Sequence, residues 1–226
     1  MLNFAVYTHV IAGVIALVVA PVAIAMKKGS RQHVRWGRIF FWSMTYVFVT
    51  AVILSIVKWI PFLLMIAFFS YYSIITAYRS VHQKQIHKGL GVTWFDWFIL
   101  ALAGVFNVSF VGYGAYQVFN GTVALGVLAI GFGGGGCLQA FSQFRTFTKP
   151  PSDKMHWFFS HGGNMLGGYI AAVTAFSTQT MHFLPDFLQW TWPSLLGVPL
   201  IAITMRYYRV KLRGGNTGSA LVEWRS

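Results

Sequence analysis

Histidine is the residue type in this sequence that is best suited to chemistry at neutral pH. Its pKa lies near physiological pH, and its ring nitrogens bind metal ions. Two of the seven histidines, His9 and His161, fall inside long apolar runs. An ionisable side chain inside a membrane usually faces the interior of a helix bundle and has a functional role. Each therefore has two open interpretations: a haem ligand or proton-handling group, or a single hydrogen bond between helices.

The stretch 154–176 around His161 is long and apolar enough to cross a bilayer. Two glycine pairs, Gly162-Gly163 and Gly167-Gly168, would let a helix or a flat ligand approach its backbone closely. We therefore expect His161 to be buried in the cytoplasmic half of the bundle, with a partner at hydrogen-bonding or coordination distance. At helical spacing, the face that carries His161 also includes Asn164, Met165, Gly168 and Ala172.

The other histidines define the alternatives. At 1.5 Å per residue, His9 lies about 9 Å below the outer edge of its run, and His161 about as deep from the cytoplasmic edge. The two would then lie in opposite leaflets and could not share one metal ion. His33, in the basic segment RQHVRWGR with Arg38, is expected to contact lipid phosphates. The alternative is that His33 joins His156 or His161 in a cytoplasmic-side site.

Several kinds of site lack their usual residues. No Asp or Glu falls inside an apolar run, so carboxylate proton relays and paired-carboxylate catalysis are not expected. Seven-helix zinc hydrolases use three histidines with an Asp and a Ser, whereas His156 and His161 are five residues apart and do not share a helix face. A retinal protein would need a lysine inside the last run, which has none before Lys211. The single cysteine, Cys137, excludes an intrachain disulfide and a cysteine metal cluster.

Six glycines lie between Gly126 and Gly136, inside an apolar run. The segment lacks the GxxxxGK[ST] pattern of a nucleotide-binding loop. It predicts instead a close helix contact or a groove lined by bare backbone, in which Gly134→Leu would destabilise the protein or block the groove. Polar residues expected to line the same interior are Asn107, Tyr113, Gln139 and Gln143.

Composition points to a multi-pass membrane protein. Of the 226 residues, 56% are hydrophobic and only 9% are charged, against about 25% charged in soluble domains. The mean hydropathy is +0.61. Runs of about 20 apolar residues predict seven transmembrane helices in one all-α domain, residues 1–213, followed by a flexible tail, residues 214–226. The expected helices are 3–26, 39–57, 61–78, 94–119, 122–141, 155–176 and 193–208, with a short interfacial helix near residues 181–188.

The basic residues indicate the orientation. The net charge of +13 is concentrated in short segments between alternate runs, so it reports topology rather than nucleic-acid binding. Counting seven runs places every basic segment on one side. We therefore expect the N-terminus outside and the C-terminus in the cytoplasm of a bacterial inner membrane, with the lipid bilayer as the main partner.

Two stretches resemble the bacterial membrane proteins grouped as "domain of unknown function 2306". The first runs from His9-Val-Ile-Ala-Gly13 through Lys28-Gly29 and His33 to Gly37-Arg38. Here Ala20 replaces the glycine before Pro21, and Val34 replaces the arginine after the loop histidine. The second begins at Met155 and ends at Phe176. The resemblance implies that a set of residues forms the functional constellation: His9, His33, Gly37, Arg38 and His161.

A looser similarity is to cytochrome b561-type bundles, in which histidines on neighbouring helices hold haem near each membrane face. It implies haem b as the cofactor, with His161 and His9 as ligands and His33, Asn164 and Arg38 in the site; His9 lacks an evident second ligand in its own leaflet. The function we expect is haem- or quinone-linked electron transfer. The alternatives are a binding or scaffold subunit of a larger membrane complex, and a small-molecule transporter.

Overall fold

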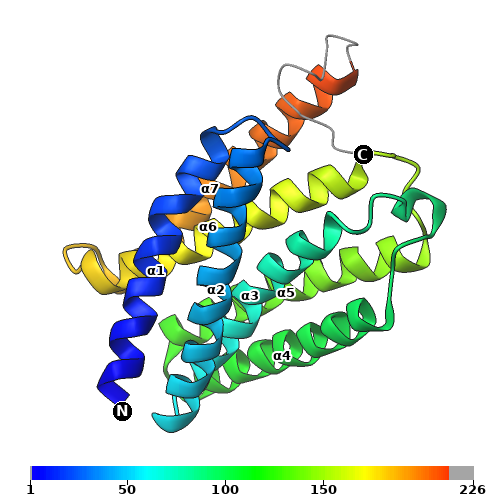
Figure 1. The fold of residues 1–226 in the computed structure, drawn as a ribbon. Helices are drawn as coiled ribbons and strands as arrows, with labels where there is room; N and C mark the ends of the chain where they lie inside the picture. The colour runs from blue at the N-terminus through cyan, green and yellow to red at the C-terminus, as the bar shows by residue number, and fades with distance from the viewer. Residues whose placement is uncertain (1, 214–226) are drawn as a thin grey trace.

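The computed structural model describes residues 2–213, which form seven α-helices and one 3-10 helix (Figure 1). This described part contains no β-strand, so the expected all-α fold class is confirmed for it. The expected C-terminal tail, residues 214–226, lies outside the described residues. The elements are α1 (Leu2–Ala25), α2 (Arg31–Val57), α3 (Pro61–Ser80), η1 (Ile86–Lys88), α4 (Trp94–Phe119), α5 (Val123–Thr148), α6 (His156–Thr180) and α7 (Asp186–Arg213).

Six of these helices are long and apolar enough to cross a membrane: α1, α2, α3, α4, α5 and α7. The remaining helix, α6, has 25 residues but does not reach the same apolar character. It carries polar side chains along its length, including His161 and Asn164. A helix of this kind needs protein rather than lipid around its polar face.

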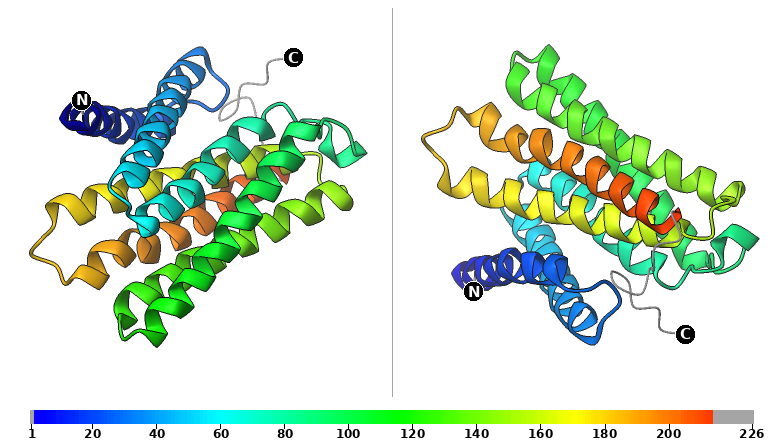
Figure 2. Two further views of the ribbon diagram at one scale, coloured as in Figure 1. Left: turned by 90° about the horizontal axis from the view of Figure 1, so that it is seen from below. Right: turned by 90° about the horizontal axis from the view of Figure 1, so that it is seen from above.

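The helices are arranged so that α6 receives that cover. Consecutive helices α1 and α2 pack as one hairpin, and α4 and α5 as another. Figures 1 and 2 show α3, α6 and α7 between these two hairpins. The central helix is α3, which contacts α2, α4, α5 and α6. Its residues 72–77 are buried without interruption, as expected for a helix covered on every side.

Several helices are longer than their apolar runs. Ser30 accepts a hydrogen bond from the backbone N–H of His33, which caps α2 and starts it at Arg31 rather than residue 39. The extra turns hold basic side chains that favour the headgroup region, so hydropathy alone missed them. Pro61 occupies the first turn of α3, where its missing N–H leaves no bond unmade. The tight turn before it contains Trp59 with a positive φ of 49°.

The segment before α7 differs from expectation. Residues 181–185 form a turn, and α7 begins at Asp186, so the expected separate interfacial helix is wrong. The helix passes through Pro193 and Pro199 without ending. In membranes, neighbouring groups can satisfy the backbone carbonyls that such prolines leave free. The predicted start at residue 193 treated Pro193 as a helix start, although it lies inside the helix.

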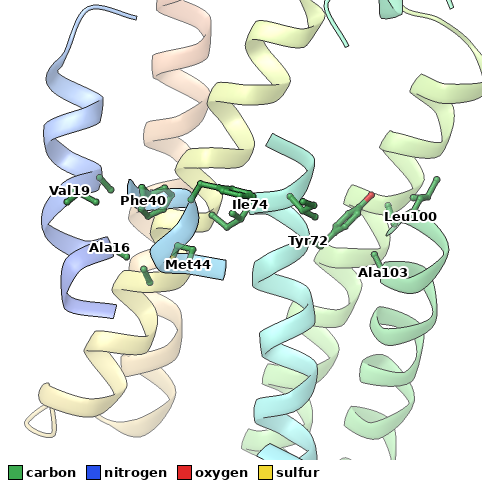
Figure 3. Close-up of a cluster of buried hydrophobic side chains, with 13 residues drawn as sticks. Ala16, Val19, Phe40, Met44, Tyr72, Ile74, Leu100 and Ala103 are labelled. Atoms are coloured by element: carbon green, nitrogen blue, oxygen red, sulfur yellow. The ribbon is translucent and has the colours of Figure 1, made fainter. Parts of the chain in front are cut away.

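The main apolar cluster joins both hairpins to the centre (Figure 3). Ala16 and Val19 of α1 face Phe40 and Met44 of α2, and Ile74 of α3 lies beside them. Small side chains predominate on α1, which lets α2 approach closely. On the far side, Tyr72, Leu100 and Ala103 continue the cluster towards α4.

The glycine-rich segment of α5 is a close helix contact, as predicted, but through different glycines. A Cβ at Gly133 would lie 2.9 Å from Asn107 O, and one at Gly126 would lie 2.6 Å from Gly114 O. Nothing lies within 4 Å of a Cβ at Gly134, so this glycine is not one of the close contacts, and the expected effect of Gly134→Leu stays a prediction. The buried small residues alternate at spacings of three and four along α5, which is one face of a helix: Gly126, Ala129, Gly133, Gly136 and Ala140.

We predict that Gly133→Ala lowers the free energy of unfolding by about 1–3 kcal/mol, because the added methyl group overpacks the contact with α4. The matched control is Gly134→Ala on the same helix. It should be neutral or stabilising by roughly 0.5–1 kcal/mol, since alanine favours helix more than glycine does. Thermal unfolding of the purified protein in detergent measures both, and equal stability of the two variants would contradict this packing.

Candidate functional site

The structure brings His33 and His161 together, although they are far apart in sequence. His33 lies in the first turn of α2, and His161 lies in the second turn of α6. Their ring centroids are 6.3 Å apart and their planes are inclined by 81°. Of the two sequence interpretations of His33, the structure therefore favours a shared site with His161. Both side chains are partly buried.

Each of these histidines hydrogen-bonds a backbone carbonyl at the end of a neighbouring helix. His33 Nδ1 lies 2.9 Å from Ala23 O in the last turn of α1. His161 Nδ1 lies 3.0 Å from Ala77 O in the last turn of α3. The last four carbonyls of a helix have no partner within the helix, so each Nδ1–H is placed as the donor. The prediction of a hydrogen-bonding partner for His161 is confirmed.

These bonds fix the chemistry that remains on each ring. With Nδ1 protonated and donating, Nε2 carries the lone pair of the neutral imidazole. Within residues 2–213, neither Nε2 has a hydrogen-bond partner. An imidazole that ligates a metal usually donates its other N–H to a carbonyl or carboxylate in this way. The pair therefore leaves one free nitrogen donor on each of two helices, α2 and α6.

His9 lies in a different part of the molecule. Its Nδ1 is 2.8 Å from Thr50 Oγ1 on α2, whose hydroxyl donates in turn to Tyr46 O at 2.7 Å. This is the interhelical hydrogen bond that was one of its two interpretations. His9 precedes Ala23 by fourteen residues, about 21 Å along α1. It therefore does not reach the His33–His161 pair.

Asn164 belongs to a polar network that joins three helices. Its Oδ1 accepts from Gln139 Nε2 at 2.7 Å, and its Nδ2 donates to Ser160 O at 2.8 Å. Gln139 Nε2 also donates to Ser73 Oγ at 3.1 Å. The hydroxyls of Ser80 and Ser160 lie 2.8 Å apart. The amide groups of Asn164 and Gln139 are thus engaged with protein, and the network ties α5 and α6 to α3 next to His161.

Other residues expected to share this interior do not. Asn107 is 1% exposed, bonds Ala103 O on its own helix and packs against Gly136. Arg38 is exposed, and five residues after His33 it is rotated by roughly 140° around α2. His156 is partly buried at the start of α6, and the ring contact of His161 is with His33.

The surface of α2 that carries His33 is turned inward. Trp36 packs against the main apolar cluster and Phe40 is 3% exposed within it. One turn from His33, on the same side of α2, Gly37 would meet nothing within 4 Å of an added Cβ. Gly163 is also open, but two residues after His161 it lies on the opposite face of α6. Bare backbone with open space therefore adjoins His33, and such a position admits a flat ligand against a helix.

Lys28 lies in the turn between α1 and α2. Its ammonium donates to Ile24 O, next to the carbonyl that His33 uses, and to Met26 O at 3.4 Å. Burial lowers the pKa of this ammonium. The positive charge of Lys28 lies close enough to His33 and His161 to interact with both side chains. Sequence analysis named Lys28 only as part of the first stretch that carries the family resemblance and gave it no role in the site. Its position after an apolar run was the available signal, since cations favour helix C-termini.

A second polar group was also missed, at the junction of α3 and α4. Arg79 binds the carboxylate of Asp96 with two nitrogens, at 2.7 and 2.9 Å, and Asp96 also accepts from the backbone N–H of Thr93 at 2.8 Å. The Thr-x-x-Asp spacing is the signal of this helix start. Beside the pair, the buried hydroxyl of Tyr72 lacks a hydrogen-bond partner and lines a cavity about the size of one water molecule.

Comparison with protein families, curated proteins and solved structures gives no match. The described residues also contain no group of three or more His, Cys, Asp or Glu side chains that could hold a metal ion. The candidate site is therefore defined by its own geometry: two histidines, a lysine and an adjoining amide and hydroxyl network.

We predict that Gln139→Leu lowers the free energy of unfolding by about 1–2 kcal/mol, because Asn164 Oδ1 loses its donor inside the bundle. Gln143→Leu is the matched control, one turn further along α5, where the amide makes no hydrogen bond with residues 2–213. Thermal unfolding in detergent should show a loss for the first variant alone. A stable Gln139→Leu protein would mean that the network contributes nothing to the fold.

Proposed function

We propose that the protein is an integral membrane electron carrier that binds one haem b between His33 and His161. The observation that carries this proposal is the geometry of the pair. Two imidazoles that bind one metal ion from opposite sides at about 2.0 Å have ring centroids about 6 Å apart, once half of each ring is added. The centroid distance is 6.3 Å, and both Nδ1 atoms are engaged with carbonyls.

The number of ligands also favours haem over a bare metal ion. A structural zinc site takes four protein ligands, and the described residues provide no cluster of even three. Haem brings four nitrogens of its own and needs only axial ligands from the protein. The open position at Gly37, one turn from His33, suits a flat macrocycle. In this proposal His33 takes the role that the sequence assigned to His9.

The surroundings suit one-electron transfer near one membrane face. A haem held by His33 and His161 would supply one-electron redox chemistry. The proposed donor is a quinol in the bilayer, which would give up its two electrons one at a time and release its two protons, and the proposed acceptor is a partner at the cytoplasmic surface. Asn164 and its network position α6, and hence His161, through protein hydrogen bonds. Arg38, which is exposed, contributes positive charge at this face rather than a ligand.

We further propose that all seven helices span a bacterial inner membrane, with the N-terminus outside. Support for α6 as a span comes from its contacts with α1, α3 and α7, which keep its polar face away from lipid. Basic residues of the α1–α2, α3–α4, α5–α6 and C-terminal segments then share the cytoplasmic side.

The topology has a direct test. Alkaline phosphatase, which is active only outside the cytoplasm, is fused after Ser226 and, separately, within the segment 181–185. The first fusion should be inactive and the second active. Activity at Ser226 would overturn the proposed orientation, and the second fusion controls for insertion of the protein.

The cofactor is tested by visible absorption of the purified full-length protein. We predict a Soret band and, after reduction, a sharp α-band. His33→Ala and His161→Ala should each remove most of the absorption, because each takes away an axial ligand, whereas His161→Met should keep part of it. His9→Ala should keep all of it, since His9 bonds Thr50.

A further signature comes from the angle between the rings. Near-perpendicular imidazole planes leave two iron d orbitals almost equal in energy, so the oxidised protein should give a strongly anisotropic low-spin EPR signal. A folded protein that stays colourless in haem-replete cells and after addition of haem would overturn the proposal. The scaffold-subunit interpretation would then be favoured.

A further inference from the structure

The α1–α2 turn holds a charge that has no counter-ion among the described residues, 2–213. The described acidic residues are Asp96, Asp153 and Asp186. Asp96 binds Arg79, Asp153 accepts from the backbone of Met155, and Asp186 accepts from Gln189. The one salt bridge within residues 2–213 is Arg79–Asp96. Lys28 is therefore a partly buried cation whose hydrogen bonds go only to carbonyls.

The position of Lys28 distinguishes it from the other basic residues. It and His33 bond adjacent carbonyls, those of Ile24 and Ala23, so the ammonium and the imidazole both lie at the end of α1. The neighbouring Lys27 is exposed, as a headgroup-facing lysine should be. A cation removed from water needs an anionic partner to offset its desolvation. That partner must come from outside the described residues.

We propose that the ligand of the His33–His161 site carries a carboxylate group and that Lys28 binds it. This inference rests on the proposed function, in which the group is a propionate of haem b. Lys28 then fixes the rotation of the macrocycle about the axis between the histidines. In this arrangement three side chains hold one ligand. His33 and His161 bind the metal, and Lys28 binds the acidic edge of the macrocycle.

The test compares haem b with its dimethyl ester, in which both propionates are neutral. Full-length protein from haem-depleted cells, in zwitterionic detergent without lipid, is titrated with each ligand and followed at the Soret band. We expect about tenfold or tighter binding of the free acid, the usual contribution of one charge-assisted hydrogen bond. Lys28→Met should remove this preference, because it takes away the charge that distinguishes the acid from the ester. Lys27→Met is the matched control and should keep the preference.

The outcomes separate the two proposals. Equal binding of acid and ester by the wild-type protein, with absorption typical of two axial histidines, would overturn the role of Lys28 and leave the proposed function standing. If neither haem b nor its dimethyl ester gives this absorption, both the role of Lys28 and the proposed function are overturned. A preference that disappears when phosphatidylglycerol is added would assign Lys28 to a lipid phosphate and overturn the inference. Lys28→Arg, which keeps the charge, should retain the preference, and its loss would likewise contradict the assignment.

Discussion

The bundle depends on how the free carbonyls at two helix ends are satisfied. A helix leaves its last four carbonyls without partners, and hydrocarbon offers none. At the end of α1 the donors are His33 and Lys28, and at the end of α3 the donor is His161. The two histidine bonds tie a helix end to another helix, whereas Lys28 caps α1 from the adjoining turn, and each bond orients its side chain at the same time. The same hydrogen bonds therefore satisfy the free carbonyls and hold the side chains of the candidate site in place.

Much of the fold could be predicted because the bilayer imposes simple rules. Apolar length located the helices, whereas the orientation inferred from the alternating basic segments stays a prediction. Polar helix ends were missed, as at the start of α2, because capping by Ser30 is local chemistry that hydropathy does not report. Proline misled the prediction at Pro193, since a membrane helix can continue through it.

The candidate site was only partly predictable. Sequence analysis selected His161 from its polar face and offered His33 as an alternative partner, but it also gave weight to His9. What decided between them is which helix face meets α6, and that depends on packing between segments far apart in the chain. The same limit applies to the glycines: spacing predicted a close contact, yet only the packing against α4 distinguishes Gly133 from Gly134.

Two kinds of order coexist in the bundle. The α4–α5 hairpin is held by direct backbone approach, with no room for a methyl group at several glycines. The centre is held instead by polar side chains, in the network around Asn164 and in the histidine bonds to helix ends. Direct packing gives a rigid unit without chemistry, whereas the polar contacts leave functional groups exposed to a ligand.

The distance along the chain between the paired histidines has a consequence for biogenesis. His161 follows His33 by 128 residues, which takes on the order of ten seconds to synthesise at 5–20 residues per second. Throughout that interval the α1–α2 hairpin is already made while its partner helix has not left the ribosome. A cofactor captured earlier would have one axial ligand and no second wall. If the proposed haem is bound, insertion of α6 would therefore precede its loading, and the nascent α1–α2 hairpin would be the intermediate that waits for α6.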